Sequence, residues 1–330
     1  MDPRDMWVVP VSVADQQTHG GRPFPLVLEC RSEPDLEGAT AWLTSRRDEL
    51  VRQAADHGVV LFRGFPVFTA QDFDAFVATF GLPNFPYYES LSNAVRVNRT
   101  PRVFTANEAP PDVVIYLHHE MAQTPVYPSH LFFFCEQPAA TGGATPVCRS
   151  DVLWEKLKDR CPQFTRDLET KNLRYSHIMP AENDTTSGMG RSWQSTLRAT
   201  TRQEAEQRLT ELGYSWEWQP RGGLRATTPV LPAVRRLPHG RTTFFNQLIA
   251  ASQGWKDERN DPSRAITYGD GTPLDRAGAA EAAKLADELA FDLPWRQGDV
   301  ALVDNFVAMH GRRTFTGTRK VLASLVASCS

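Results

Sequence analysis

The spacing of histidine and acidic residues is the feature of this chain most suited to metal chemistry. The sequence contains eight histidines, and His118 alone has an acidic residue two positions later, Glu120, in the segment LHHEMA. On an extended strand, residues i and i+2 point to the same face, so these two side chains could bind one ion. They directly follow the apolar run VVIYL, and the end of a strand is accessible to a ligand. A hydrogen-bonded histidine at the end of a strand would give the same pattern.

Two further residues near the C-terminus could complete such a site. His310 lies between two apolar runs in FVAMHGRRTFTGTRKVLASLVA, and Arg319 directly precedes the last strand-like part of this segment. Two histidines and one carboxylate on one face of an iron ion leave three positions open, as in non-haem Fe(II) oxygenases. An arginine binds both oxygens of a carboxylate and stays charged, so Arg319 could hold the remote carboxylate of an organic acid on that iron.

Short strands with interspersed helices must position these residues. A helix is expected from Pro34 to Gly58. A capping box at Thr69 and Asp72 begins a second helix, and Thr201 and Glu204 begin another. Residues 1–33 are expected to be an irregular lead-in. Predicted strands are 59–65, 113–117, 130–135, 144–148, 242–248, 299–305 and 320–327, and other predicted helices are 151–158 and 275–291.

Many strands with few intervening helices do not suit a doubly wound parallel sheet. The pattern favours a mainly β fold with flanking helices (α+β), a β-sandwich or jelly roll. We expect one domain over residues 1–330, with a helical segment at about 34–82 and a mixed insert at about 151–240.

Composition narrows the classes of function. The chain of 330 residues has a net charge of −3, which argues against a nucleic-acid binder, and it contains no run of 18 apolar residues that could span a membrane. The N-terminus lacks the pattern of a signal peptide, and the five cysteines include no C-x-x-C pair. We therefore expect reduced thiols in the cytoplasm. A chain of this length folds without a metal, so a bound metal would serve chemistry.

Six motifs in order resemble the Fe(II)/2-oxoglutarate-dependent oxygenases of the taurine dioxygenase family, and in particular its SyrP-like branch, which is associated with β-hydroxylation of amino acids in natural-product pathways. The resemblance covers roughly residues 55–327. The motifs are VVLFRGF, YLHHEMA, FFFC-x2-P-A-x2-GG-x-TP, FFN (244–246), YGDG (268–271) and PW-x2-GDV-x3-DN-x4-HGR-x2-F-x-G-x-R.

This resemblance implies a double-stranded β-helix core with Fe(II) bound by His118, Glu120 and His310. It implies that Thr145 and Arg319 bind the cosubstrate 2-oxoglutarate, and that O2 is the second cosubstrate. Ala323 stands where the taurine enzyme has a second arginine for the sulfonate, so sulfonates are disfavoured. Glu120 also argues against halogenation, because halogenating relatives replace this carboxylate with Gly or Ala.

Four other residues are candidates for contacts with substrate, each with a structural alternative. Strand alternation should turn His119 to the opposite face, where it contacts substrate or packs. Asn246 ends an aromatic strand and faces the cavity or a hairpin edge. Arg312 binds a substrate carboxylate or forms a structural ion pair. Arg191 lies in the segment 187–200, a Gly-hinged lid or an ordinary loop.

We therefore predict an enzyme that hydroxylates an unactivated C–H bond of an amino acid or an amino-acid-like small molecule in a biosynthetic pathway. The substrate is free or bound to a carrier protein, which the basic segment 232–241 could contact. The same cofactor chemistry could instead end in desaturation, cyclisation or epimerisation. A non-catalytic jelly-roll protein that binds a small ligand is the alternative from another class.

Overall fold

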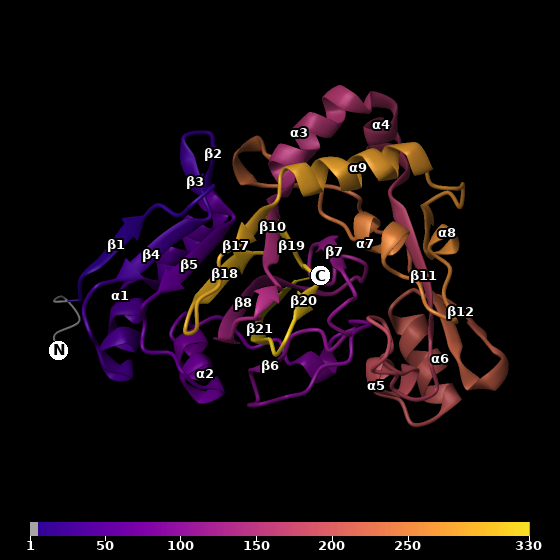
Figure 1. Ribbon diagram of the computed structural model, residues 1–330. Coiled ribbons are helices and arrows are strands. Elements are labelled where there is room, and N and C mark those ends of the chain that lie inside the picture. Colours follow the sequence, from indigo (N-terminus) through magenta and orange to yellow (C-terminus); the bar gives the residue numbers. More distant parts are fainter. Residues whose placement is uncertain (1–5, 330) are drawn as a thin grey trace.

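Two β-sheets occupy the centre of the computed structural model, which describes residues 6–329 (Figure 1). The larger sheet has seven strands in the order β1-β4-β5-β18-β8-β21-β6, and the smaller has the order β17-β10-β19-β7. The bounds in the larger sheet are β1 Val8–Val11, β4 Leu26–Cys30, β5 Val59–Arg63, β6 Phe104–Thr105, β8 Tyr127–Gln137, β18 Val300–Asp304 and β21 Lys320–Cys329. Those in the smaller are β7 Ile115–His118, β10 Thr145–Arg149, β17 Phe291–Leu293 and β19 Ala308–Arg312.

Alternating side chains of β8 explain how the larger sheet is buried on both faces. Leu131 and Phe133 join a core cluster that also contains Val147 of the smaller sheet. Phe132 and Phe134 point the other way, into a cluster with residues of the helices α1 (Leu36–His57) and α2 (Ala70–Ala78). Because successive side chains on a strand face opposite sides, a continuous aromatic run can fill both cores.

The N-terminal segment extends the larger sheet, which corrects the expectation of an irregular lead-in. Of the strands within residues 6–33, β1 pairs with β4, and β4 also pairs with β5 further along the chain. The other two, β2 (Gln17–His19) and β3 (Arg22–Phe24), form a separate pair. Prolines in this segment favoured irregular structure, but β1, which contains Pro10, is an edge strand, where a proline is tolerated. The first five residues of the predicted lead-in lie outside the described residues.

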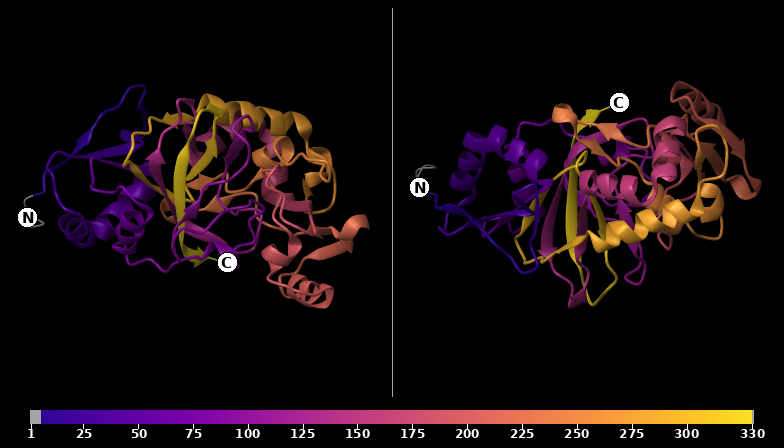
Figure 2. Two further views of the ribbon diagram at one scale, coloured as in Figure 1. Left: turned by 60° about the horizontal axis from the view of Figure 1, so that its bottom comes forward. Right: turned by 90° about the horizontal axis from the view of Figure 1, so that it is seen from above.

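Residues 150–290 leave the two sheets between β10 and β17, and include the predicted insert at 151–240. They form the sheet β12-β13-β11-β16 and most of the helices, at the end of the molecule opposite the N-terminal elements (Figure 2). Their bounds are α3 Ser150–Arg160, α4 Pro162–Lys171, β11 Leu173–Met179, α5 Trp193–Leu197, α6 Arg202–Glu211, β12 Ser215–Trp218, β13 Leu224–Thr227, β14 Arg235–Arg236, β15 Thr242–Thr243, α7 Leu248–Gln253, α8 Pro262–Ala265, β16 Ile266–Tyr268 and α9 Arg276–Glu288. Two short strands, β9 Thr141–Gly142 and β20 Phe315–Thr316, pair beside the smaller sheet.

The predicted helix ends agree with the structure, whereas the predicted strand 242–248 is too long. Capping boxes are present at Thr69 and Thr201, and Gly58 follows the last residue of α1 with φ 82°. The predicted strand 242–248 is wrong beyond Thr243. The Asn246 side chain accepts a hydrogen bond from the backbone N–H of Leu248 and so supports a turn into α7.

Every helix among residues 6–329 is too short or too polar to span a lipid bilayer. The five cysteines are free thiols.

Candidate functional site

Pairing of two adjacent strands brings the two predicted histidine ligands together. His118 at the end of β7 lies directly opposite His310 of β19, and their ring centres are 4.4 Å apart. The Nε2 atom of His310 lies 3.3 Å from Oε2 of Glu120, and that of His118 lies 4.0 Å from it. Ligand atoms of all three residues fall within 4.8 Å of one another, and this is the one such group of His, Cys, Asp or Glu among the described side chains of residues 6–329, which leave out His239.

Glu120 reaches this point from a turn and not from a strand. Strand β7 ends at His118, and the positive φ of Met121 (58°) follows Glu120. Asn305 fixes the turn, because its Oδ1 accepts from the Glu120 N–H at 2.7 Å and its Nδ2 donates to the Glu120 carbonyl at 3.0 Å. The convergence therefore depends on a residue 185 positions away.

Local contacts keep His118 and Glu120, two of the predicted ligands, in the protonation states that a metal requires. His118 Nδ1 lies 2.7 Å from the carbonyl of Tyr116 and must donate to it, which leaves Nε2 of the neutral ring free to coordinate. Burial, followed by the nearby His310, lowers the pKa of His118 to about 4. Burial opposes ionisation of Glu120, but Arg96 and His310 hold the pKa of its carboxyl well below the usual range.

Thr145 and Arg319 line a small inner cavity of about 50 Å³ behind the three ligands. Arg319 Nε donates to the Gly143 carbonyl at 2.7 Å and Nη2 donates to Thr145 Oγ1 at 3.2 Å. Trp295 Nε1 also donates to Thr145 Oγ1, at 2.9 Å. The hydroxyl thus accepts two hydrogen bonds, so its proton is left to donate to a ligand.

The positive charge of Arg319 has no anion among its hydrogen-bond partners, so it can bind the carboxylate of a ligand. Both of its hydrogen-bond partners are neutral oxygens, and burial, together with the positive charge of Arg312, lowers its pKa to about 10. A carboxylate bound here would relieve the cost of burying this cation.

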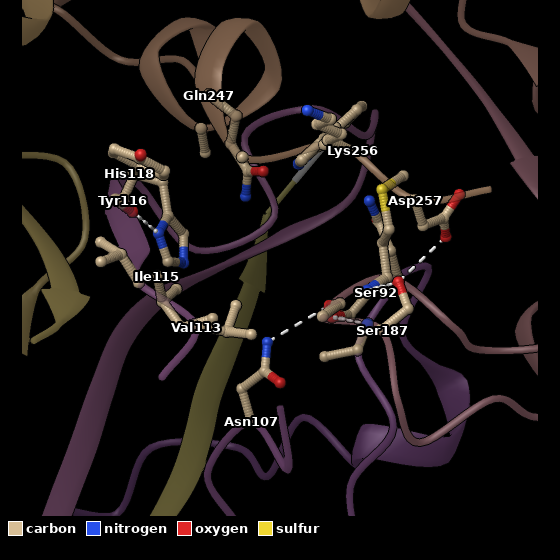
Figure 3. Close-up of a pocket in the computed structure, with 18 of the residues that line it drawn as sticks. Ser92, Asn107, Val113, Ile115, Tyr116, His118, Ser187, Gln247, Lys256 and Asp257 are labelled. Atoms are coloured by element: carbon tan, nitrogen blue, oxygen red, sulfur yellow. Dashed lines mark hydrogen bonds between the residues drawn. The ribbon is translucent and has the colours of Figure 1, made fainter. Parts of the chain in front are cut away.

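A larger cavity of about 450 Å³ opens on the other side of His118 and Glu120. In Figure 3, His118 faces it from one side, and Ser187 and Asp257 lie on the other, joined by a hydrogen bond of 2.9 Å. Side chains of both charges line it, among them Arg96, Asp184, Lys256, Asp257, Glu258 and Arg259. Its volume suits a small-molecule ligand.

The structure does not place His119 or Asn246 on either cavity, which corrects their candidacy as substrate contacts. His119 is fully buried, its Nδ1 donates to the Asn305 carbonyl at 2.5 Å, and its ring packs on Phe245. Asn246 donates to the Ala233 carbonyl at 2.7 Å and caps the turn before α7. Both side chains hydrogen-bond to backbone carbonyls, and neither lines one of these two cavities.

The two candidate arginines are likewise occupied by backbone carbonyls. Arg191 is buried and donates to the carbonyls of Ser90 and Ser195, so this part of the predicted lid is anchored; residues 184 and 186–189 line the larger cavity. Arg312 borders the inner cavity, but its guanidinium donates to four carbonyls in residues 107–113. It therefore holds this segment in place.

Sequence reasoning missed three residues of the site. Asn305 and Trp295 stand inside quoted motifs (DN and PW), so a signal existed for each without a role. Arg96 lies in an irregular segment before β6, and no pattern pointed to it.

Two histidines and a carboxylate on one face, with an arginine-lined cavity behind them, define a non-haem iron oxygenase site. The chain matches the family described as "Taurine catabolism dioxygenase TauD, TfdA family" over residues 24–325. It belongs to this family of Fe(II)- and 2-oxoglutarate-dependent dioxygenases, and is an enzyme that uses Fe(II), 2-oxoglutarate and O2. The non-catalytic alternative is thereby set aside.

Relatives and solved structures agree with this assignment. A clavaminate synthase-like protein of Arabidopsis thaliana is 38% identical over 328 residues, which cover 97% of this chain and 99% of the relative. The dapdiamide synthesis protein DdaC of Enterobacter agglomerans is 28% identical over 290 residues, 82% of this chain and 83% of DdaC. The fold is similar to AAD-2 in complex with Mn(II) and N-oxalylglycine (TM-score 0.54, 15% identity, 98% of each chain). It is also similar to PvcB of Pseudomonas aeruginosa (TM-score 0.54, 16% identity, 98% of this chain and 91% of PvcB).

Proposed function

We propose that this enzyme hydroxylates an unactivated C–H bond of an amino acid or amino-acid-like small molecule in a biosynthetic pathway. His118, Glu120 and His310 bind the iron, and Thr145 and Arg319 bind the remote carboxylate of 2-oxoglutarate. The observation that carries the proposal is the meeting of the three ligand atoms within 4.8 Å beside a cavity that ends at Arg319. Bound iron with 2-oxoglutarate supplies the power to oxidise a C–H bond. The protein supplies position and excludes water.

The larger cavity supports a small dipolar substrate. It carries cationic and anionic side chains at once, which suits a molecule with both an acidic and a basic group. Ala323 is fully buried between β8 and β6 and offers no cation for a sulfonate. DdaC, a synthesis protein, and PvcB, described as an oxygenase of an isonitrile synthetic pathway, support a biosynthetic role, while membership of the SyrP-like branch stays a prediction from the sequence motifs. Free cysteines support a cytoplasmic location.

The order of the sheets supports a jelly-roll core. Along the chain, β6, β8, β18 and β21 belong to the larger sheet, and β7, β10, β17 and β19 to the smaller. The chain thus crosses repeatedly between four strands of the seven-stranded sheet and the four strands of the smaller sheet, as in a double-stranded β-helix. In this arrangement β7 and β19 are neighbouring strands of the smaller sheet, and the two histidines lie on its inner face.

Succinate release tests the proposal. Wild-type protein with Fe(II), 2-oxoglutarate and O2 is assayed against amino acids, free and loaded on a carrier protein. We expect stimulated succinate release with one of them, a hydroxylated product by mass spectrometry, and no turnover for Glu120→Ala. Glu217→Ala, which removes an exposed acid of β12, is the control and should keep turnover. A product lacking two hydrogens, or a cyclised or epimerised one, would replace hydroxylation by that outcome; unchanged turnover in Glu120→Ala would refute the ligand assignment.

A further inference from the structure

Arg96 lies in the wall between the two cavities and lines both of them. Its side chain is only 8% exposed. The guanidinium carbon lies 4.9 Å from the ring centre of Tyr87 and 5.4 Å from that of Phe104. These rings hold the cation in one place beside the metal ligands.

Part of the Arg96 guanidinium has no hydrogen-bond acceptor in the part of the chain that the structure describes. A guanidinium has five N–H groups, and Nη2 donates to the two oxygens of Glu120 at 3.2 and 3.3 Å. Nε is buried without a hydrogen-bond partner among residues 6–329. A buried donor without a partner is unfavourable, so the geometry favours an acceptor that enters from one of the cavities.

Charge leads to the same conclusion. Fe(II) brings two positive charges, 2-oxoglutarate two negative ones and Glu120 one more. Arg319 and Arg96 each add a positive charge, while the two imidazoles coordinate in the neutral form. These groups together keep one net positive charge, and Arg312, which donates only to backbone carbonyls, adds another at the inner cavity. Arg319 faces the remote carboxylate, and Glu120 would be shared between Arg96 and the metal, so Arg96 can pair with a further carboxylate.

We propose that Arg96 is a second carboxylate-binding residue of this site, beside the metal ligands. The carboxylate is either the one next to the keto group of 2-oxoglutarate or a free carboxylate of the substrate. The inference rests on the proposed function and deepens it, because a substrate bound this way is a free acid and not a carrier thioester. If Arg96 serves only as the counter-charge of Glu120, it binds neither.

Binding measurements on Mn(II)-loaded protein separate these cases without turnover. Wild type, Arg96→Met and Arg96→Lys are first titrated with Mn(II) by electron paramagnetic resonance. At saturating Mn(II), the affinity for N-oxalylglycine is measured by calorimetry. With both bound, thermal shifts are recorded for the common amino acids as free acids and as primary amides. Lys158→Met removes an exposed cation of α3, outside both cavities, and is the control for loss of charge.

We expect Arg96→Met to weaken the binding of one of the two ligands about 10-fold or more at saturating Mn(II), with partial recovery in Arg96→Lys and no change in Lys158→Met. Weaker N-oxalylglycine binding identifies the cosubstrate as the source. Loss of a wild-type preference for acids over amides identifies the substrate. If N-oxalylglycine affinity is unchanged and no such preference is lost, the proposal is overturned. If Arg96→Met does not fold, Arg96→Lys and Arg96→Gln decide the same question. Failure of wild type to bind Mn(II) and N-oxalylglycine would instead overturn the proposed function, and this proposal with it.

Discussion

The metal end of the site and the wall of the larger cavity are built in different ways. His118, Thr145 and His310 lie on paired strands of the smaller sheet, where register fixes each side chain. The opposite wall of the larger cavity comes from loops, including residues 184–189 and 254–259, which hydrogen bonds such as Ser187–Asp257 hold together. The strands hold side chains for the chemistry that the family shares, while the loops line the part of the larger cavity where we expect substrate specificity to be determined.

Replacing one strand ligand should have the largest effect. His310→Ala removes a metal-coordinating nitrogen that no nearby side chain can replace, and we expect the affinity for the metal to fall about 100-fold or more. His119→Ala is the matched control next to a ligand. It should lower the free energy of unfolding by about 1–3 kcal/mol, because the Asn305 carbonyl loses its partner, yet keep metal binding. A Mn(II) titration decides, and the reverse result would move the triad.

Arg319→Ala should separate cosubstrate binding from metal binding. We expect the affinity for 2-oxoglutarate to fall by about 2–4 kcal/mol, because a buried cation loses its carboxylate, while Mn(II) affinity stays near normal. Calorimetry with N-oxalylglycine measures the first and the Mn(II) titration the second. Equal loss of both would mean that Arg319 is structural.

A smaller effect is expected for Trp295, which acts through Thr145. Trp295→Phe removes one donor to Oγ1 and lets the hydroxyl proton turn away, so we expect 2-oxoglutarate affinity to fall by about 1 kcal/mol. The same change in a Thr145→Val background should have no further effect. Additive losses in this double-mutant cycle would show that Trp295 does not orient the hydroxyl.

Effects of pH on stability compare a histidine of the site with one outside it. Burial lowers the pKa of both His118 and His177 to about 4, below the value near 6.5 of an unfolded chain. The unfolded state then binds more protons, so the free energy of unfolding of the metal-free protein should fall as pH drops from about 6.5 to about 4. His118→Gln and His177→Gln should each flatten this slope by at most about 1.4 kcal/mol per pH unit in urea unfolding. An unchanged slope would show that these rings protonate normally in the fold.

The features that could be predicted from the sequence follow the same division between strands and loops. The three proposed ligands could be predicted because each stands in a short motif beside an apolar run, and the pairing of β7 with β19 places them side by side. Asn305 and Arg96 could not be assigned, since the contact of Asn305 spans 185 residues and Arg96 precedes β6 in an irregular segment. Arg191 shows the opposite failure, because a polar residue that binds backbone carbonyls has the same sequence signature as one that binds a ligand.

A crystal structure of the protein with Mn(II) and N-oxalylglycine, with the metal located by its anomalous signal, tests the central claim most directly. The account predicts one metal ion bound by Nε2 of His118, Nε2 of His310 and a carboxylate oxygen of Glu120, and a ligand whose far carboxylate contacts Arg319 and Thr145. A metal held by other side chains, or a ligand that enters the site without touching Arg319, would contradict it.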